Sequence, residues 1–98
     1  AYEAGALEET LAVAAGGDAA LLAELRASYM DSVNRQIDLL ERSRCDGNWH
    51  VAAMRLKGLA ASFHSAALLA LAEEALDPPG DPAVVRRLKS YISEFSGA

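Results

Sequence analysis

Two histidines, His50 and His64, are the side chains of this sequence best suited to covalent chemistry. An imidazole is a good nucleophile near neutral pH and can accept a phosphoryl group on a ring nitrogen. On one continuous helix they would lie about 21 Å apart, since each residue advances about 1.5 Å along the axis. That separation, with Cys45 outside the helix, excludes a metal site shared by these three residues. Each histidine is therefore either a separate candidate phosphoacceptor or an ordinary exposed side chain.

The helix expected to carry both histidines has two different sides around Met54. At about 100° per residue, the mostly bulky apolar residues fall on one side. These are Leu56, Leu59, Ala60, Phe63 and Ala67. Small residues and one lysine surround Met54 on the other side, and these are Lys57, Gly58, Ala61 and Ser65. The first side suits a core, and the second suits the docking of another protein.

Residues 53–58, Ala-Met-Arg-Leu-Lys-Gly, resemble the Ala-His-x-Leu-Lys-Gly signature of histidine-containing phosphotransfer (HPt) domains. The resemblance continues to residue 72, with His64-Ser65 in place of the Gly-Ala pair usual in that family. It implies an HPt-like, up-and-down antiparallel four-helix bundle. It also implies docking on the receiver domain of a response regulator or hybrid kinase. In the family pattern, the position of Met54 holds the phosphoacceptor histidine.

Met54 decides what this resemblance predicts about chemistry. A thioether has no proton to lose and forms no usable phosphoester or phosphoramidate, so we expect binding without phosphotransfer and no catalytic residue. Met54 is then either an apolar residue that fills a groove or an adaptable apolar contact for a partner. His50 lies one turn before Met54 on roughly the same side, whereas His64 lies further along. Both remain alternatives as relocated acceptors.

Lys57 and Gly58 complete the expected docking side. Lys57 matches the family lysine beside the phosphohistidine, which the resemblance implies offsets phosphate charge; otherwise it is a solvated helix lysine. Gly58 is more informative, because glycine inside a helix costs about 1 kcal/mol relative to alanine. Close approach of another backbone would offset that cost. The approaching backbone belongs either to a neighbouring helix of this chain or to a partner, and the position near Met54 favours a partner.

The composition predicts a single domain over residues 1–98 and argues against several classes of function. The 98 residues, 52% of them hydrophobic, suffice for one compact core. The formal net charge of −5 argues against nucleic acid or an anionic membrane as the partner. The longest apolar run, residues 66–72, is too short to span a bilayer. A single cysteine allows no internal disulfide and fits a cytoplasmic protein.

Hydrophobic periodicity predicts an all-α fold with four helices. They are expected over residues 3–15, 19–43, 49–76 and 82–95. Asp18 and Asp81 are expected as N-caps of the second and fourth helices, and Asp46 or Asn48 as the N-cap of the third.

The sequence thus predicts a monomeric, cytoplasmic HPt-like module that binds a receiver domain and is not an enzyme. Its predicted partner-binding residues are His50, Met54, Lys57, Gly58, Ala61, His64 and Ser65. No cofactor or metal is expected. Two alternatives remain. One is an active phosphocarrier that uses His50 or His64, and the other is a helical dimerisation or scaffold module with no receiver partner.

Overall fold

Helices make up most of the chain in the computed structural model, which describes residues 2–97 and the side chains of residues 7 and 9–95. Residues 2–97 form five helices and no strand. The helices are α1 (Tyr2–Ala15), α2 (Ala19–Arg42), α3 (Asp46–Ser62), α4 (Ala66–Leu76) and α5 (Pro82–Gly97). The prediction of an all-α fold is confirmed.

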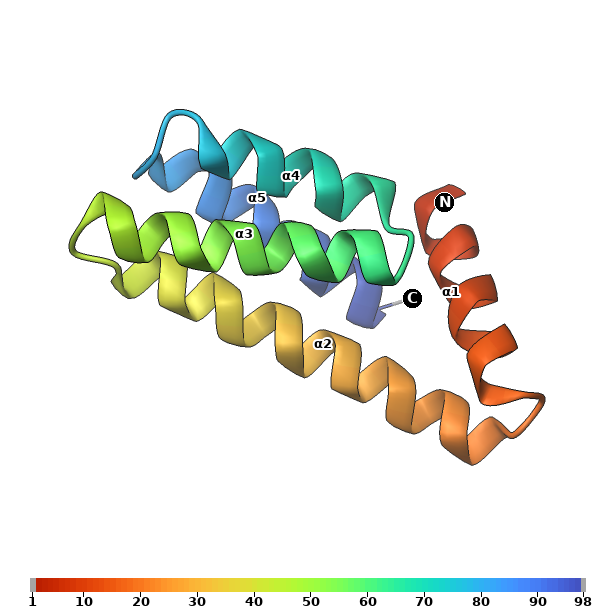
Figure 1. Cartoon of the computed structure of the whole chain (residues 1–98). Helices are drawn as coiled ribbons and strands as arrows, with labels where there is room; N and C mark the ends of the chain where they lie inside the picture. Colours follow the sequence, from red (N-terminus) through yellow and green to blue (C-terminus); the bar gives the residue numbers. More distant parts are fainter. Residues whose placement is uncertain (1, 98) are drawn as a thin grey trace.

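Four of the helices, α2 to α5, lie side by side along the 43 Å long axis of the molecule (Figure 1). Each packs against two others: α3 lies next to α2 and α4, and α5 lies next to α4 and α2. α1 packs against α2 and lies across one end of the other helices (Figure 1). The arrangement leaves α3 with one side that faces away from its neighbours.

Aspartate side chains cap the N-termini of α2 and α5, as the sequence predicts. Asp18 Oδ1 accepts hydrogen bonds from the backbone N–H groups of Ala20 and Leu21, at 2.9 and 3.1 Å. Asp81 Oδ1 accepts one from the backbone N–H of Ala83 at 2.9 Å. Each carboxylate satisfies N–H groups that have no partner inside the first helical turn. These two predicted caps are confirmed.

The predicted cap of the third helix is wrong. Cys45 occupies the N-cap position, and its Sγ accepts a hydrogen bond from the backbone N–H of Asn48 at 3.5 Å. The helix therefore begins at Asp46, three residues earlier than expected. Asp46 lies in the first turn instead of before it, where its negative charge still interacts favourably with the helix dipole.

The prediction of one helix over residues 49–76 is also wrong. α3 ends at Ser62, and α4 begins at Ala66 after a sharp turn. The turn needs one residue with left-handed backbone, and His64 supplies it with φ of 56°. Glycine adopts this conformation readily, whereas a residue with a Cβ seldom does. The sequence therefore gives no glycine signal for the break.

Hydrogen bonds in the turn satisfy the end of α3 and the start of α4. The backbone N–H of Ser65 donates to the carbonyl of Ala60 at 2.8 Å, and that of His64 donates to the carbonyl of Ala61 at 3.4 Å. This pair of bonds is a Schellman motif. Ser65 Oγ then accepts a hydrogen bond from the backbone N–H of Leu68 at 3.2 Å, which caps α4. One three-residue turn thus ends one helix and begins the next.

The left-handed backbone at His64 leads to a prediction about stability. Such a conformation costs a residue with a Cβ roughly 1–2 kcal/mol. Glycine avoids this cost, but it loses more chain entropy on folding, so the net gain is smaller than the full cost. We expect His64→Gly to raise the free energy of unfolding by about 1 kcal/mol in urea unfolding. His64→Ala, which removes the imidazole but keeps the Cβ, should bring no such gain. Equal stabilities for the two variants would contradict the prediction.

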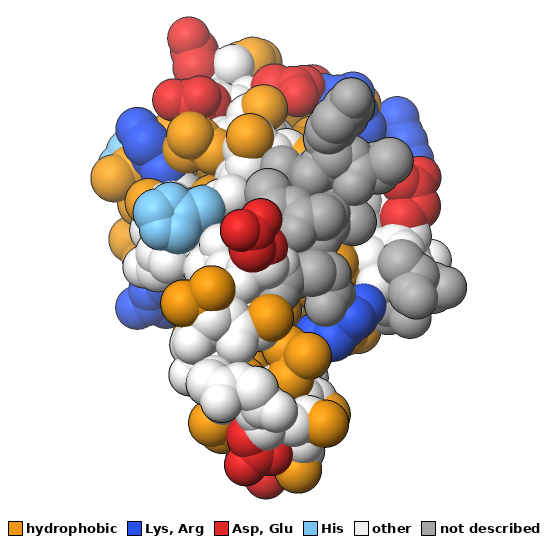
Figure 2. Space-filling model, turned by 90° about the vertical axis from the view of Figure 1, so that its right-hand side faces the viewer, with side chains coloured by type: hydrophobic (Ala, Val, Ile, Leu, Met, Phe, Trp, Pro, Cys, Tyr) orange, Lys and Arg blue, Asp and Glu red, His pale blue; other side chains and the backbone are white. Residues whose placement is uncertain are grey.

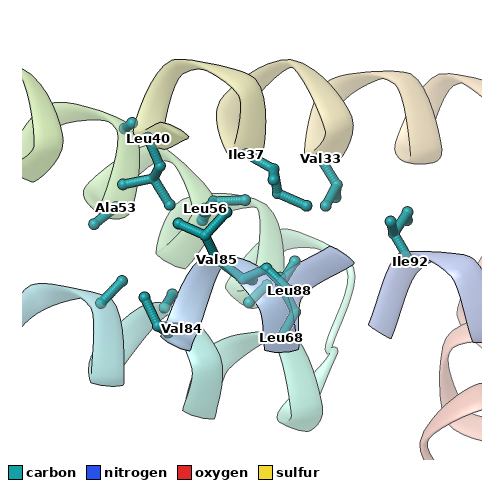
Figure 3. Close-up of a cluster of buried hydrophobic side chains, with 14 of the residues drawn as sticks. Val33, Ile37, Leu40, Ala53, Leu56, Leu68, Val84, Val85, Leu88 and Ile92 are labelled. Carbon is teal, nitrogen blue, oxygen red and sulfur yellow. The ribbon is translucent and has the colours of Figure 1, made fainter. Parts of the chain in front are cut away.

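A hydrophobic core fills the space between α2, α3, α4 and α5. Its side chains point toward one another from all four helices (Figure 3). They include Val33, Ile37 and Leu40 from α2, Ala53 and Leu56 from α3, Leu68 from α4, and Val84, Val85, Leu88 and Ile92 from α5. Trp49, near the start of α3, is also buried, and its Nε1–H donates to the carbonyl of Ala75 at 2.6 Å. Because these contacts hold one side of α3 against the core, the opposite side of α3 faces the solvent.

Candidate functional site

The outward side of α3 carries five of the seven predicted partner-binding residues. His50, Met54, Gly58 and Ala61 are exposed, and Lys57 is partly exposed. They share one side because residues three or four apart in a helix lie next to each other. We call this surface, from His50 to Ala61, the α3 face.

The centre of the α3 face is apolar. Met54 is 45% exposed and Val51, three residues earlier, is 46% exposed. Both side chains are large enough to lose considerable apolar surface to a partner, and neither is needed to fill the core. Sequence reasoning missed Val51, although its spacing from Met54 places it on the same side of the helix.

Gly58 lies one turn after Met54 and is exposed. A Cβ built on Gly58 has no heavy atom of the described chain within 4 Å, leaving aside its chain neighbours and the nearby backbone of its own helix. The alternative of a tight crossing with another helix of this chain is therefore wrong for the described residues. Nothing described in this chain offsets the cost of a glycine inside α3. The backbone of α3 is instead open to close approach from outside.

Positive charge borders this apolar centre. Arg55 is exposed and Lys57 is partly exposed, and neither forms an ion pair or side-chain hydrogen bond within the described residues. The single acidic residue in the sequence of α3 is Asp46, in the first turn. The α3 face is therefore suited to acidic groups, although the chain as a whole carries a formal net charge of −5.

Ser65 does not belong to the site, so its prediction as a partner-binding residue is wrong. Its side chain is 1% exposed and lies inside the molecule. Ser65 Oγ lies 3.0 Å from the hydroxyl oxygen of Tyr91, which in turn lies 2.8 Å from that of Tyr29. The end of α3 at Ser62 is the physical reason, because the chain turns inward before it reaches Ser65.

His64 is exposed, but it lies in the turn after α3 and is not part of the α3 face. Figure 2 faces the end of the molecule that holds α1 and this turn, and histidine is among the side chains at the surface there. The structure thus separates the two histidines into different surroundings. His50 lies on the α3 face one turn before Met54, and His64 lies at a helix junction.

The described residues contain no group of three His, Cys, Asp or Glu side chains placed to hold a metal ion. Cys45 is a free, exposed cysteine whose described role is to cap α3. Among the described helices, none is both long enough and apolar enough to cross a lipid bilayer. Apart from the imidazole of His50, the α3 face offers an apolar patch with cationic neighbours.

The chain was compared with protein-family models, with curated proteins and with solved structures. None of the three comparisons found a match.

Proposed function

We propose that this chain is an HPt-like module that binds the receiver domain of a response regulator or hybrid kinase through the α3 face, without phosphotransfer, because Met54 replaces the acceptor histidine. The observation that carries the proposal is the exposed Gly58, one turn from the exposed Met54, with open space around its Cβ position. A helix glycine that no neighbour requires points to a partner whose backbone approaches closely at this point.

The turn between α3 and α4 supports the HPt-like part of the proposal. The family pattern has Gly-Ala where this chain has His64-Ser65. His64 nonetheless adopts the left-handed conformation that glycine prefers. A left-handed residue at the position of the family glycine is compatible with the proposed resemblance, although the residue type differs. The mutual packing of α2, α3, α4 and α5 is likewise compatible with the proposed HPt-like four-helix bundle.

The side chains on the α3 face support binding rather than transfer. A receiver domain carries its phosphoryl group on an aspartate, and transfer requires a nucleophile opposite that group. At the centre of the α3 face stands the thioether of Met54, which cannot serve. Lys57 and Arg55 still complement an acidic partner surface. Such a module would occupy a receiver without discharging it.

An NMR titration of isotopically labelled protein with receiver domains from the same source tests the proposal. Each receiver is added with and without Mg²⁺ and beryllofluoride, which mimics the phosphoryl group. We expect chemical-shift changes over residues 50–61 and unchanged signals over the exposed side of α4. Failure of every receiver to shift these signals would refute the proposed function. Transfer of acid-labile phosphate to His50 or His64 would refute its no-transfer part and support the relocated-acceptor alternative.

Gly58 allows stability and binding to be changed in opposite directions. We expect Gly58→Gln to raise the free energy of unfolding by about 0.5–1 kcal/mol, because glutamine is a far better helix former than glycine. The same side chain should block close approach and weaken receiver binding by about tenfold or more. Urea unfolding and the NMR titration measure the two effects.

Ala70→Gln, at an exposed position of α4, is the matched control because it adds a side chain of the same type outside the α3 face. It should leave receiver affinity unchanged. Unchanged affinity in Gly58→Gln as well would show that no partner backbone approaches Gly58.

A further inference from the structure

A groove runs between the C-terminal end of α2 and the first half of α3. Its volume is about 530 Å³, which is within the range of natural binding clefts. The lining residues are Leu39, Arg42 and Ser43 on the α2 side, and Asn48, Val51, Ala52 and Arg55 on the α3 side. Val51 and Arg55 place the groove beside the α3 face, but most of its lining lies outside that face.

The lining of the groove is basic, because it contains Arg42 and Arg55 and no Asp or Glu. Residues 42–57 hold four of the nine Lys and Arg residues but one of the 14 Asp and Glu residues. This segment has a formal net charge of +3, whereas the whole chain has −5. A second hollow shares Arg42 and Ser43 with the groove and adds Glu41 and Arg44. The lining of the groove thus carries positive charge on a protein whose net charge is negative.

The arginines at the groove are available to a ligand. Arg55 and Arg44 form no ion pair or side-chain hydrogen bond within the described residues. Arg42 pairs with Asp38 at 2.9 Å, but both side chains are more than half exposed. An exposed pair at this i,i+4 spacing contributes only about 0.3–0.5 kcal/mol, so a ligand carboxylate can replace Asp38 at little cost.

The floor of the groove is apolar. Ala52 is buried, Leu39 is half-buried and Val51 is 46% exposed. Ser43 does not add a free donor, because its Oγ–H donates to the carbonyl of Leu39 at 2.7 Å. A small inorganic anion would leave this apolar strip in water, whereas a peptide side chain would cover it. The groove is lined by two arginines, too few to neutralise the successive phosphates of a nucleic-acid strand.

We propose that the groove between α2 and α3 binds an acidic peptide segment of a partner protein. One apolar side chain of the segment packs on Leu39 and Val51, and the flanking carboxylates pair with Arg42 and Arg55. This binding site shares Val51 and Arg55 with the α3 face, but peptide binding there does not require a receiver domain. It gives the chain a way to recognise a partner by an extended acidic stretch.

A labelled peptide of about ten residues, with glutamates around a central phenylalanine, is the probe. Fluorescence anisotropy measures its affinity for the full chain, and NMR locates the contact. We expect shift changes at Leu39, Val51 and Ala52, and an affinity that falls as salt is added. Replacing the phenylalanine by serine should weaken binding about tenfold, because the apolar contact is lost. Equal affinity for the two peptides, or shifts away from the groove, would refute the proposal.

Charge reversal on the protein completes the test. Arg42→Glu and Arg55→Glu should each weaken binding of the phenylalanine peptide by about tenfold. Arg35→Glu is the matched control, since Arg35 pairs with Asp31 on the same helix at the same i,i+4 spacing but lies outside the groove. An equal loss in Arg35→Glu would mean that overall charge, and not the groove, attracts the peptide. That result would also overturn the proposal, as would unchanged affinity in Arg42→Glu and Arg55→Glu.

Discussion

Met54→His is expected to turn the chain from a protein that takes no phosphate from a phosphorylated receiver into one that does. The position is 45% exposed on the α3 face, so a histidine there reaches solvent and partner alike. Lys57 lies nearly one turn further along the same side and offers a positive charge to the transferred group. The missing element is the nucleophile, which an imidazole supplies.

Radiolabelled phosphoryl transfer from a receiver that binds in the NMR titration measures this gain. The substitution is made in a chain that also carries His50→Gln and His64→Gln, so the new imidazole is the sole possible histidine acceptor. We expect no labelling before the substitution and acid-labile labelling that approaches one group per chain after it. A binding receiver that transfers nothing to Met54→His would mean that Met54 does not occupy the acceptor position.

Leu56→Ala is expected to have the largest effect on stability. Leu56 is fully buried on the inner side of α3, where Figure 3 shows it among core side chains of α2, α4 and α5. Truncating such a leucine removes apolar contacts and leaves a cavity, which costs about 2–5 kcal/mol. A domain of this size has a total stability of only about 5–15 kcal/mol, so the loss should be visible as a much lower urea midpoint.

The neighbouring residue provides the control for this substitution. Arg55 is exposed and without a described partner, so Arg55→Ala should change the free energy of unfolding by less than about 0.5 kcal/mol. The changes in the free energy of unfolding caused by substituting these two adjacent residues are thus expected to differ several-fold. Similar effects of the two substitutions would contradict the placement of Leu56 in the core.

The division of α3 into an inner and an outer side could be predicted from sequence because it depends on helical period alone. Leu56 and Ala60 are buried and Met54 and Ala61 are exposed, as their angular positions require. The caps at Asp18 and Asp81 were predictable for a similar reason, since their chemistry is local.

Other features of the site depend on interactions that the sequence does not reveal. The turn at residues 63–65 has histidine where a left-handed residue is needed, so the usual glycine signal is missing. Ser65 has the small size expected of a docking residue, but its role as a cap inside the molecule follows from that turn. The open space around Gly58 depends on where the neighbouring helices lie, and no local pattern specifies that.

The single tryptophan of the chain gives these experiments an internal spectroscopic reporter. Trp49 lies on the side of α3 away from Met54, where it is buried and its Nε1–H donates a hydrogen bond to the carbonyl of Ala75. Its emission should shift to longer wavelength when the core opens to water, but should change little when a ligand covers the α3 face. Intrinsic fluorescence can therefore distinguish a variant that has lost its fold from one that has lost its partner, in the same cuvette and without a label.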